Sequence, residues 1–255
     1  MNRRNYQIEL EKILANIKNS LEKIDKGQGT RIVTTEKEIT EKEIIEKYTT
    51  EEQATEEQAG TEVQPPTLLL HSCCAPCSSY VMEYLCQFFE ITVFYYNPNI
   101  SSSVEYHKRL QEEKRLIDAY NKERKGYFIS IIDGEYEPGR FLEQVKGLEH
   151  CKEGGERCFK CFELRLWETA KLAKENSFDY FATTLTISPL KNAQKINEIG
   201  EKIAQTEGIC WLPSDFKKKN GYKRSIELSK EYDLYRQNYC GCSFSKEESL
   251  HKEQK

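Results

Sequence analysis

The stretch Thr67-Leu68-Leu69-Leu70-His71-Ser72-Cys73-Cys74-Ala75-Pro76-Cys77 determines the fold predicted for this chain. Its apolar half is typical of a buried strand over 67–71, and Ser78 or Ser79 is suited to cap an amphipathic helix that follows. In an open α/β sheet such a strand-to-helix turn lies at the carboxyl edge, where ligands bind. The three cysteines therefore lie where helix amide groups favour anionic thiolates.

Strand and helix patterns alternate along the rest of the chain. Strands are expected at 67–71, 91–96, 127–132, 179–184 and 209–212, and helices at 78–89, 104–124, 138–146, 158–175, 190–207 and 222–232. Because alternating strands and helices form parallel sheets covered on both faces, the fold class is α/β. We expect a three-layer, Rossmann-like (HUP-like) parallel sheet with helices on both faces.

Composition divides the chain into four parts. Apolar residues at helical spacing predict an N-terminal helix within 1–26. Residues 27–65 form a low-complexity acidic insertion with too little apolar surface to fold, so we expect it to be disordered. The catalytic α/β domain is expected over 66–246, and a flexible tail over 247–255.

Charge and cysteine content restrict the cellular setting. The formal net charge is -4, but residues 35–64 hold ten Glu and three Lys, which leaves the remainder at +3. We find no secretory signal and no apolar run of the ~20 residues that span a bilayer. The ten cysteines are therefore expected in a reducing cytoplasm, where close cysteine pairs serve as metal ligands or catalytic thiols rather than structural bridges. We expect a monomer that does not bind a membrane.

Two cysteine groups could share one metal. Cys158 and Cys161 open a predicted helix, where thiolates three residues apart suit iron-sulfur or zinc ligation. Thioredoxin-like redox chemistry or two packed core cysteines are alternatives. With Cys73 and Cys74 they would supply four thiolates, which fits a 4Fe-4S cluster or a structural zinc. Cys77 could ligate a second metal or simply line the site.

Cys240 and Cys242 flank a glycine near the end of the chain. A disulfide between residues two apart departs from the preferred geometry, and strained disulfides are easily reduced. The pair therefore suits reversible electron transfer, although two metal ligands on a glycine turn are also possible.

Basic and aromatic residues mix before this last pair. Such a mixture fits phosphate contact and base stacking on a nucleic acid, or alternatively a solvated helix face. Asp215, at the start of the segment, could ligate a metal. The candidate substrate-binding residues are Lys217, Lys218, Lys219, Lys223, Arg224 and Arg236.

Six segments in order along the chain resemble those of the epoxyqueuosine reductase QueH family. They cover about Thr67 to Ser245 and read His71-Ser-Cys-Cys-Ala-Pro-Cys77, Phe94-Tyr-Tyr-Asn-Pro-Asn-Ile100, Gly154-Gly-Glu-Arg-Cys-Phe-Lys-Cys161, Phe178-Asp-Tyr-Phe-Ala-Thr-Thr-Leu-Thr-Ile-Ser-Pro189, Arg224-Ser-Ile-Glu227 and Leu234-Tyr-Arg-Gln-Asn-Tyr-Cys-Gly-Cys-Ser-Phe-Ser245. The acidic insertion falls outside the resemblance.

The resemblance implies reductive removal of the epoxide oxygen of epoxyqueuosine in a tRNA anticodon loop, which gives queuosine. It implies a 4Fe-4S cluster and an electron donor, and some family members are thought to hold a further iron. The cysteines that match the cluster ligands are Cys73, Cys74, Cys158 and Cys161, and those that match a redox-active pair are Cys240 and Cys242. Cys77 and Asp215 are our candidates for the further metal.

Two other classes of function stay open on the residues alone. One is a zinc-stabilised RNA-binding module without catalysis, which metal content would distinguish from an iron-sulfur enzyme. The other is an ATP-dependent tRNA thiolation enzyme. That class requires a glycine-rich phosphate loop after the first strand, and cysteines occupy that position here.

Overall fold

The computed structural model of the chain describes residues 4–25 and 64–253. The predicted acidic insertion over 27–65 lies outside the described residues except for its last two positions. Its expected disorder therefore stays a prediction.

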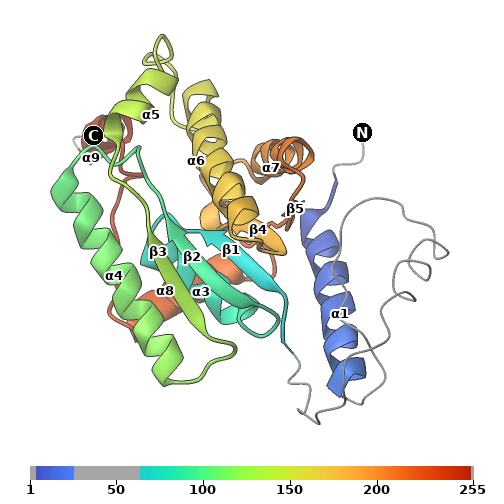
Figure 1. The fold of residues 1–255 in the computed structure, drawn as a ribbon. Coiled ribbons are helices and arrows are strands. Elements are labelled where there is room, and N and C mark those ends of the chain that lie inside the picture. Colours follow the sequence, from blue (N-terminus) through green and yellow to red (C-terminus); the bar gives the residue numbers. More distant parts are fainter. Residues whose placement is uncertain (1–3, 26–63, 254–255) are drawn as a thin grey trace.

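Five parallel strands form one sheet in the order β3-β2-β1-β4-β5 (Figure 1). The strands span Thr67–His71 (β1), Glu90–Tyr95 (β2), Ile129–Asp133 (β3), Tyr180–Thr183 (β4) and Cys210–Trp211 (β5). The chain runs outward from β1 to β3 and then returns to the other side of β1, so the strand order reverses between β1 and β4. Ligands of open α/β sheets bind at this kind of reversal. The α/β class predicted from the sequence is confirmed.

Helices cover both faces of the sheet because the central strand is apolar on both sides. Leu68 and Leu70 pack with α3 (Ala75–Leu85) and α4 (Ser103–Lys122), and α8 (Gly221–Glu231) lies against α3. On the other face, Leu69 packs with α6 (Glu156–Glu175) and α7 (Ala193–Glu207). Within the described parts of the chain, no helix combines the length and the apolar character needed to cross a membrane.

The predicted N-terminal helix is present as α1 (Tyr6–Asp25). Its buried side chains Leu10 and Leu14 belong to the same core cluster as Leu68 and Leu70. Arg4, just before the helix, forms an ion pair of 2.7 Å with Glu201 of α7. This helix is therefore part of the packed domain, although residues 26–63, which lie outside the described part of the chain, separate it from the sheet in sequence.

Local chemistry shifts two helix starts from their predicted positions. Helix α3 begins at Ala75, because Pro76 is favoured in a first helical turn, so Cys74 rather than Ser78 is the N-cap. Helix α7 begins at Ala193 rather than near 190, because the Asn192 side chain accepts a hydrogen bond of 3.1 Å from the Lys195 amide. The residues before Asn192 are thereby left in a loop.

The end of the chain is helical where a flexible tail was predicted. Helix α9 spans Ser243–Glu253, so it includes most of the segment 247–255, and the remaining residues lie outside the described part. Two contacts fix its start: the Ser245 amide donates to Cys242 Sγ at 3.3 Å, and the Cys240 amide donates to Ser245 Oγ at 3.0 Å. A third contact, from the Glu153 amide to Glu248 at 3.0 Å, holds the helix against the loop before α6. The short helix α5 (Pro138–Gln144) was predicted correctly.

Truncation of Leu10 tests whether α1 belongs to the core. Leu10 is fully buried, so Leu10→Ala should lower the free energy of unfolding by about 2–5 kcal/mol, through lost burial and a residual cavity. Ile8→Ala on the same helix is the matched control, because Ile8 is 48% exposed and should cost far less. Equal effects in urea unfolding would show that α1 does not pack as described.

Candidate thiol and metal site

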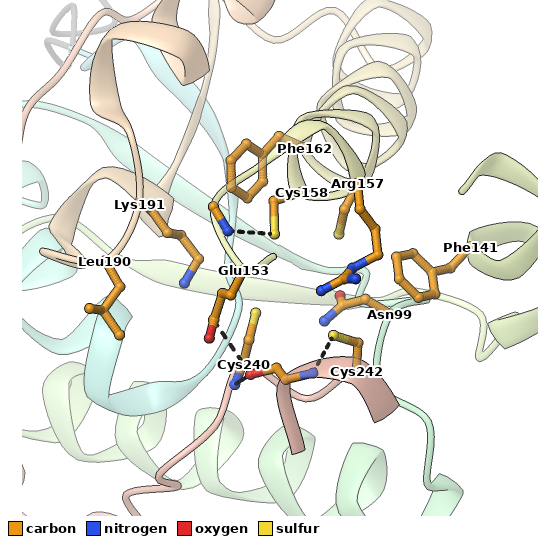
Figure 2. A pocket seen from close by; sticks show the side chains of 13 residues that line it. Asn99, Phe141, Glu153, Arg157, Cys158, Phe162, Leu190, Lys191, Cys240 and Cys242 are labelled. Atoms are coloured by element: carbon orange, nitrogen blue, oxygen red, sulfur yellow. Dashed lines mark hydrogen bonds between the residues drawn. The ribbon is translucent and has the colours of Figure 1, made fainter. Parts of the chain in front are cut away.

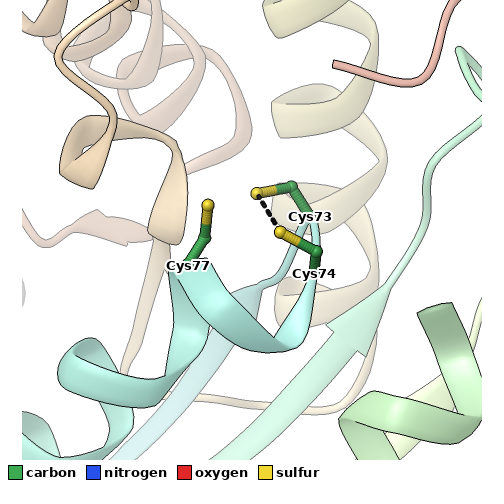
Figure 3. A group of neighbouring side chains, drawn as sticks. All are labelled: Cys73, Cys74 and Cys77. Carbon is green, nitrogen blue, oxygen red and sulfur yellow. Dashed lines mark hydrogen bonds between the residues drawn. The ribbon is translucent and has the colours of Figure 1, made fainter. Parts of the chain in front are cut away.

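Three thiols meet at the turn between β1 and α3. Cys73 follows the strand, Cys74 caps α3, and Cys77 lies in its first turn. Their sulfur atoms all lie within 4.8 Å of one another, and those of Cys73 and Cys74 are 3.9 Å apart (Figure 3). Among the described residues this group is the one set of three or more potential ligand atoms that meets this distance. The turn thus directs the thiols of the adjacent pair toward a common centre.

Hydrogen bonding divides the protons unequally among these thiols. Bonds from Cys74 and Cys77 hold the pKa of Cys73 well below its usual value. The same bond to Cys73 raises the pKa of Cys74 to about 12, and the bonds to Cys73 and Cys74 also raise that of Cys77. The group therefore releases one proton easily and holds the others, because two thiols solvate one thiolate. A cation would be needed to ionise all three.

The second thiol group lies at the starts of α6 and α9. Cys158 and Cys161 occupy the first turns of α6, and Cys158 Sγ accepts a hydrogen bond of 3.2 Å from the Gly154 amide. Cys240 and Cys242 line the same hollow from the other side (Figure 2). Burial raises the pKa of Cys161 to about 11 and that of Cys242 to about 12.

The two thiol groups border adjoining hollows. Cys73, Cys74 and Cys77 line one of them, and Cys158, Cys161, Cys240 and Cys242 line the other. The two hollows share five lining residues, namely Glu153, Leu190, Lys191, Cys240 and Ser245. The structure thus brings all three predicted cysteine groups to one edge of the sheet, but it divides the four expected cluster ligands between the two hollows.

A buried arginine connects the two groups. Arg165 of α6 donates to His71 Nε2 at 3.1 Å and to Asn97 Oδ1, and its Nη1 lies 4.0 Å from Cys161 Sγ. Burial lowers the pKa of His71 to about 3, so this imidazole is neutral and accepts from Arg165 while its Nδ1 contacts Thr183 at 2.8 Å. Arg165 is therefore a fixed positive charge among the thiols. Its place on the buried side of α6, four residues after Cys161, was the signal available in the sequence.

Lys191 is a second cation that the sequence reasoning missed. Burial opposes its charge, but the nearby thiols of Cys240, Cys73 and Cys77 outweigh that effect and raise the pKa of its ammonium group. Lys191 lies in the loop between β4 and α7, which is also at the carboxyl edge.

The loop that carries Cys240 and Cys242 is held from α4. Arg109, which is almost fully buried, donates to the Cys240 carbonyl at 3.1 Å, and the Ser101 amide donates to the Gly241 carbonyl at 3.1 Å. Gly241 has φ +123°, and a Cβ there would approach Ile100 to 2.9 Å. Only glycine fits this position.

The predicted basic residues are dispersed rather than gathered at the thiols. Lys219 forms an ion pair with Glu11 at 2.5 Å, and Arg224 forms a bidentate ion pair with the carboxylate of Glu83. Lys218 and Lys223 are exposed. Of the six candidates, Arg236 lines the hollow beside Cys73.

Asp215 forms an ion pair with Lys217, the remaining basic candidate, and lines neither hollow. The lysine ammonium satisfies this carboxylate where we expected a metal. Asp215 is therefore not among the groups that the structure brings to the thiols.

Fold and site together define a class: a parallel α/β protein that presents thiols from three helix starts near the reversal point of its sheet, an arrangement that suits metal binding or redox chemistry. Comparison with known families narrows this class. The sequence model described as "Epoxyqueuosine reductase QueH" matches residues 68–248. The chain belongs to the QueH family.

Matches to similar proteins extend over most of this chain and most of each relative. The proteins named "Epoxyqueuosine reductase QueH" from Streptococcus pyogenes serotype M1 and Staphylococcus epidermidis are 48% and 46% identical over 180 and 182 residues. These matches cover 71% of this chain in both cases, and 70% and 76% of the relatives. The protein of that name from Thermotoga maritima is 36% identical over 185 residues, which is 70% of this chain and 90% of the relative.

Alkylation of the metal-free protein tests the unequal proton sharing. A thiolate reacts and a thiol does not, so near pH 7 iodoacetamide should modify Cys73 well before Cys74 or Cys242. The difference should narrow as the pH approaches the raised values of about 12. Fragment mass spectra assign each site, and Cys151, outside both hollows, is the reference. Equal rates for Cys73 and Cys74 near pH 7 would contradict this electrostatic account.

Proposed function

We propose that this chain is an epoxyqueuosine reductase, which removes the epoxide oxygen of epoxyqueuosine in the anticodon loop of tRNA and leaves queuosine. The observation that carries the proposal is the convergence of three cysteine groups on the sheet edge of a QueH-family fold. The proposal places the reaction in the cytoplasm, where tRNA is found. The electrons come from a separate donor.

The residues present fit an iron-sulfur cluster. We propose Cys73, Cys74, Cys158 and Cys161 as the ligands of a 4Fe-4S cluster, which supplies electrons one at a time when bound. Thiolate ligands carry negative charge, and Arg165 lies beside Cys161 to offset it. Amide groups at the starts of α3 and α6 act in the same direction.

A further iron is the second part of the metal proposal. Cys77 lies within 4.8 Å of both Cys73 and Cys74, so it could bind an iron beside the cluster. Since Asp215 is held by Lys217, the proposal for this extra iron depends on Cys77.

The hollow beside Cys73 has the size and lining for one extruded nucleoside. Its cavity volume is about 310 Å³, within the range of small-ligand sites. Tyr222 and Tyr239 line it and offer rings for base stacking, while Gln237 Oε1 is buried without a hydrogen-bond partner. Enzymes that modify a base bring it out of the stack into such a pocket.

Cations at the rim suit the tRNA backbone. Arg236 is exposed at the edge of this hollow, and its Nη1 donates to Ser229 Oγ at 3.1 Å. Two further lysines are exposed: Lys218 lies just before α8, and Lys223 lies on α8, which also contributes Tyr222. We propose that these cations contact phosphates around the bound nucleoside.

Cys240 and Cys242 are proposed as the redox-active pair. Cys240 lines both hollows, so it borders the proposed cluster and the proposed substrate position. Gly241, with its positive φ, forms the turn between the two cysteines. Reversible oxidation of this pair would store two electrons between turnovers.

Nucleoside analysis tests the proposed function directly. Anaerobically reconstituted protein, incubated with epoxyqueuosine-containing tRNA and dithionite, should yield a nucleoside one oxygen atom lighter by mass spectrometry. An unchanged nucleoside alongside a protein that contains zinc and no iron would instead support a non-catalytic RNA-binding module.

Serine substitution separates the redox pair from the cluster. In the double variant Cys240→Ser/Cys242→Ser we expect multiple-turnover activity to be abolished and the visible cluster absorbance to be largely kept, because the pair does not ligate the cluster. Cys210→Ser is the matched control, since Cys210 lies on β5 outside both hollows. Multiple turnovers by the double variant would refute the redox role.

A further inference from the structure

Lys191 is held in a defined position at the carboxyl edge of the sheet. After β4 and the single 3₁₀ turn η1 (Thr184–Ile187), the chain forms a tight loop before α7. In this loop the Lys191 amide donates to the Ser188 carbonyl at 3.2 Å, and the Leu190 amide donates to Ser188 Oγ at 3.3 Å. The loop is thus fixed by its own hydrogen bonds beside the point where the strand order reverses.

The lysine side chain points into the hollows rather than to solvent. Figure 2 shows its side chain extending into the hollow, with the ammonium group on the side where Glu153 lies. Lys191 is half-buried and lines both the thiol hollow and the hollow proposed for the nucleoside. It therefore lies where the reacting part of a bound substrate would meet the electron source.

Other cations near the hollows are already occupied or lie farther out. Arg157 donates to the Glu149 and Cys151 carbonyls and pairs with Glu248 at 3.4 Å. Arg236 is exposed at the rim. In the described part of the chain, no carboxylate oxygen lies within 4.0 Å of the Lys191 ammonium nitrogen, the limit for an ion pair. Glu153 nevertheless lines the same two hollows.

The charges that face Lys191 come from four elements. Cys73 and Cys77 face it from the β1–α3 turn and Cys240 from the C-terminal loop, while Arg165 of α6 opposes its charge. Glu153 borders it from the loop before α6. A lysine ammonium group is ordinarily charged at neutral pH, and the sulfur atoms that face it are softer and weaker hydrogen-bond acceptors than an oxygen anion. An oxygen that gains negative charge in this hollow would compete successfully for the three N–H donors.

Resting on the proposed function, we propose that Lys191 is a catalytic residue that binds the epoxide oxygen and stabilises its negative charge as it leaves. In the reaction both C–O bonds of the epoxide break and a C=C bond forms. Two electrons from a low-potential one-electron donor are consumed. The oxygen takes up two protons, ultimately from solvent, and departs as water. The positive charge of Lys191 acts where negative charge develops on the oxygen.

Replacement of Lys191 by a neutral side chain of similar length tests this role. In Lys191→Met we expect the single-turnover rate of deoxygenation to fall by at least about 100-fold, as when one oxyanion donor is lost. Lys191→Arg keeps the charge on a bulkier group and should recover part of the rate. Lys195→Met is the matched control, because Lys195 lies one turn along on α7, paired with Glu198 at 3.3 Å.

Two readouts do not depend on turnover. The metal-free Lys191→Met protein should bind epoxyqueuosine-containing tRNA with the affinity of the wild type, and the reconstituted variant should keep its iron content and visible spectrum. Loss of tRNA affinity that accounts for the slower reaction would make Lys191 a phosphate contact and overturn the proposal. Loss of iron, or an unchanged rate, would overturn it as well.

Failure of the proposed function gives a different pattern. In that case the wild type and Lys195→Met would also leave epoxyqueuosine intact, and the inference about Lys191 would fall with it. The catalytic role alone predicts a specific combination of results. The wild type and Lys195→Met are active, and the Lys191→Met variant is slow although it binds tRNA and iron normally.

Discussion

The candidate site depends on the gathering of several thiols at one edge of a sheet, among groups that favour negative charge on sulfur. Helices α3, α6 and α9 all begin at this edge, and each start carries cysteine: Cys74, Cys158 and Cys242. Free amide groups at a helix start favour negative charge, and they donate to sulfur here from Gly154 and Ser245. Buried Arg165 adds a full positive charge between the groups. Burial still raises the pKa of Cys161 and Cys242, so these donors offset part of the cost of negative charge on sulfur, and a bound metal would have to supply the rest.

The fold could be predicted because its determinants are local. Three fully buried leucines, 68–70, indicate a central strand, and alternating helices indicate parallel neighbours. The cysteine groups were also visible as candidate sites, since a thiol pair after a strand or at a helix start has few structural uses in a reducing compartment. The N-terminal helix followed from apolar spacing alone, and its leucines join the core.

Other features could not be predicted because they depend on contacts between distant segments. Lys191 carries no sequence signature, and the position of Arg165 on α6 indicates burial but not its partners. The role of Arg165 depends in part on Cys73, which lies more than 90 residues away in the sequence, and that of Lys191 depends on thiols of the β1–α3 turn and the C-terminal loop. Helix α9 has a weakly apolar sequence, and its start is fixed by Cys242, Ser245 and the distant Glu153. Conversely, the basic run 217–219 looked like a nucleic-acid site, whereas Lys217 and Lys219 are neutralised by acidic neighbours.

The account's central claim is that thiols from the β1–α3 turn and from α6 hold one shared iron-sulfur centre. Mössbauer spectroscopy with iron and sulfide analysis, on anaerobically reconstituted wild type, Cys74→Ala and Cys161→Ala, tests this most directly. We predict about four irons and four sulfides per wild-type chain, with the same cluster signal reduced in both variants. Zinc in place of iron, or a cluster signal that survives intact when either cysteine is removed, would contradict the claim.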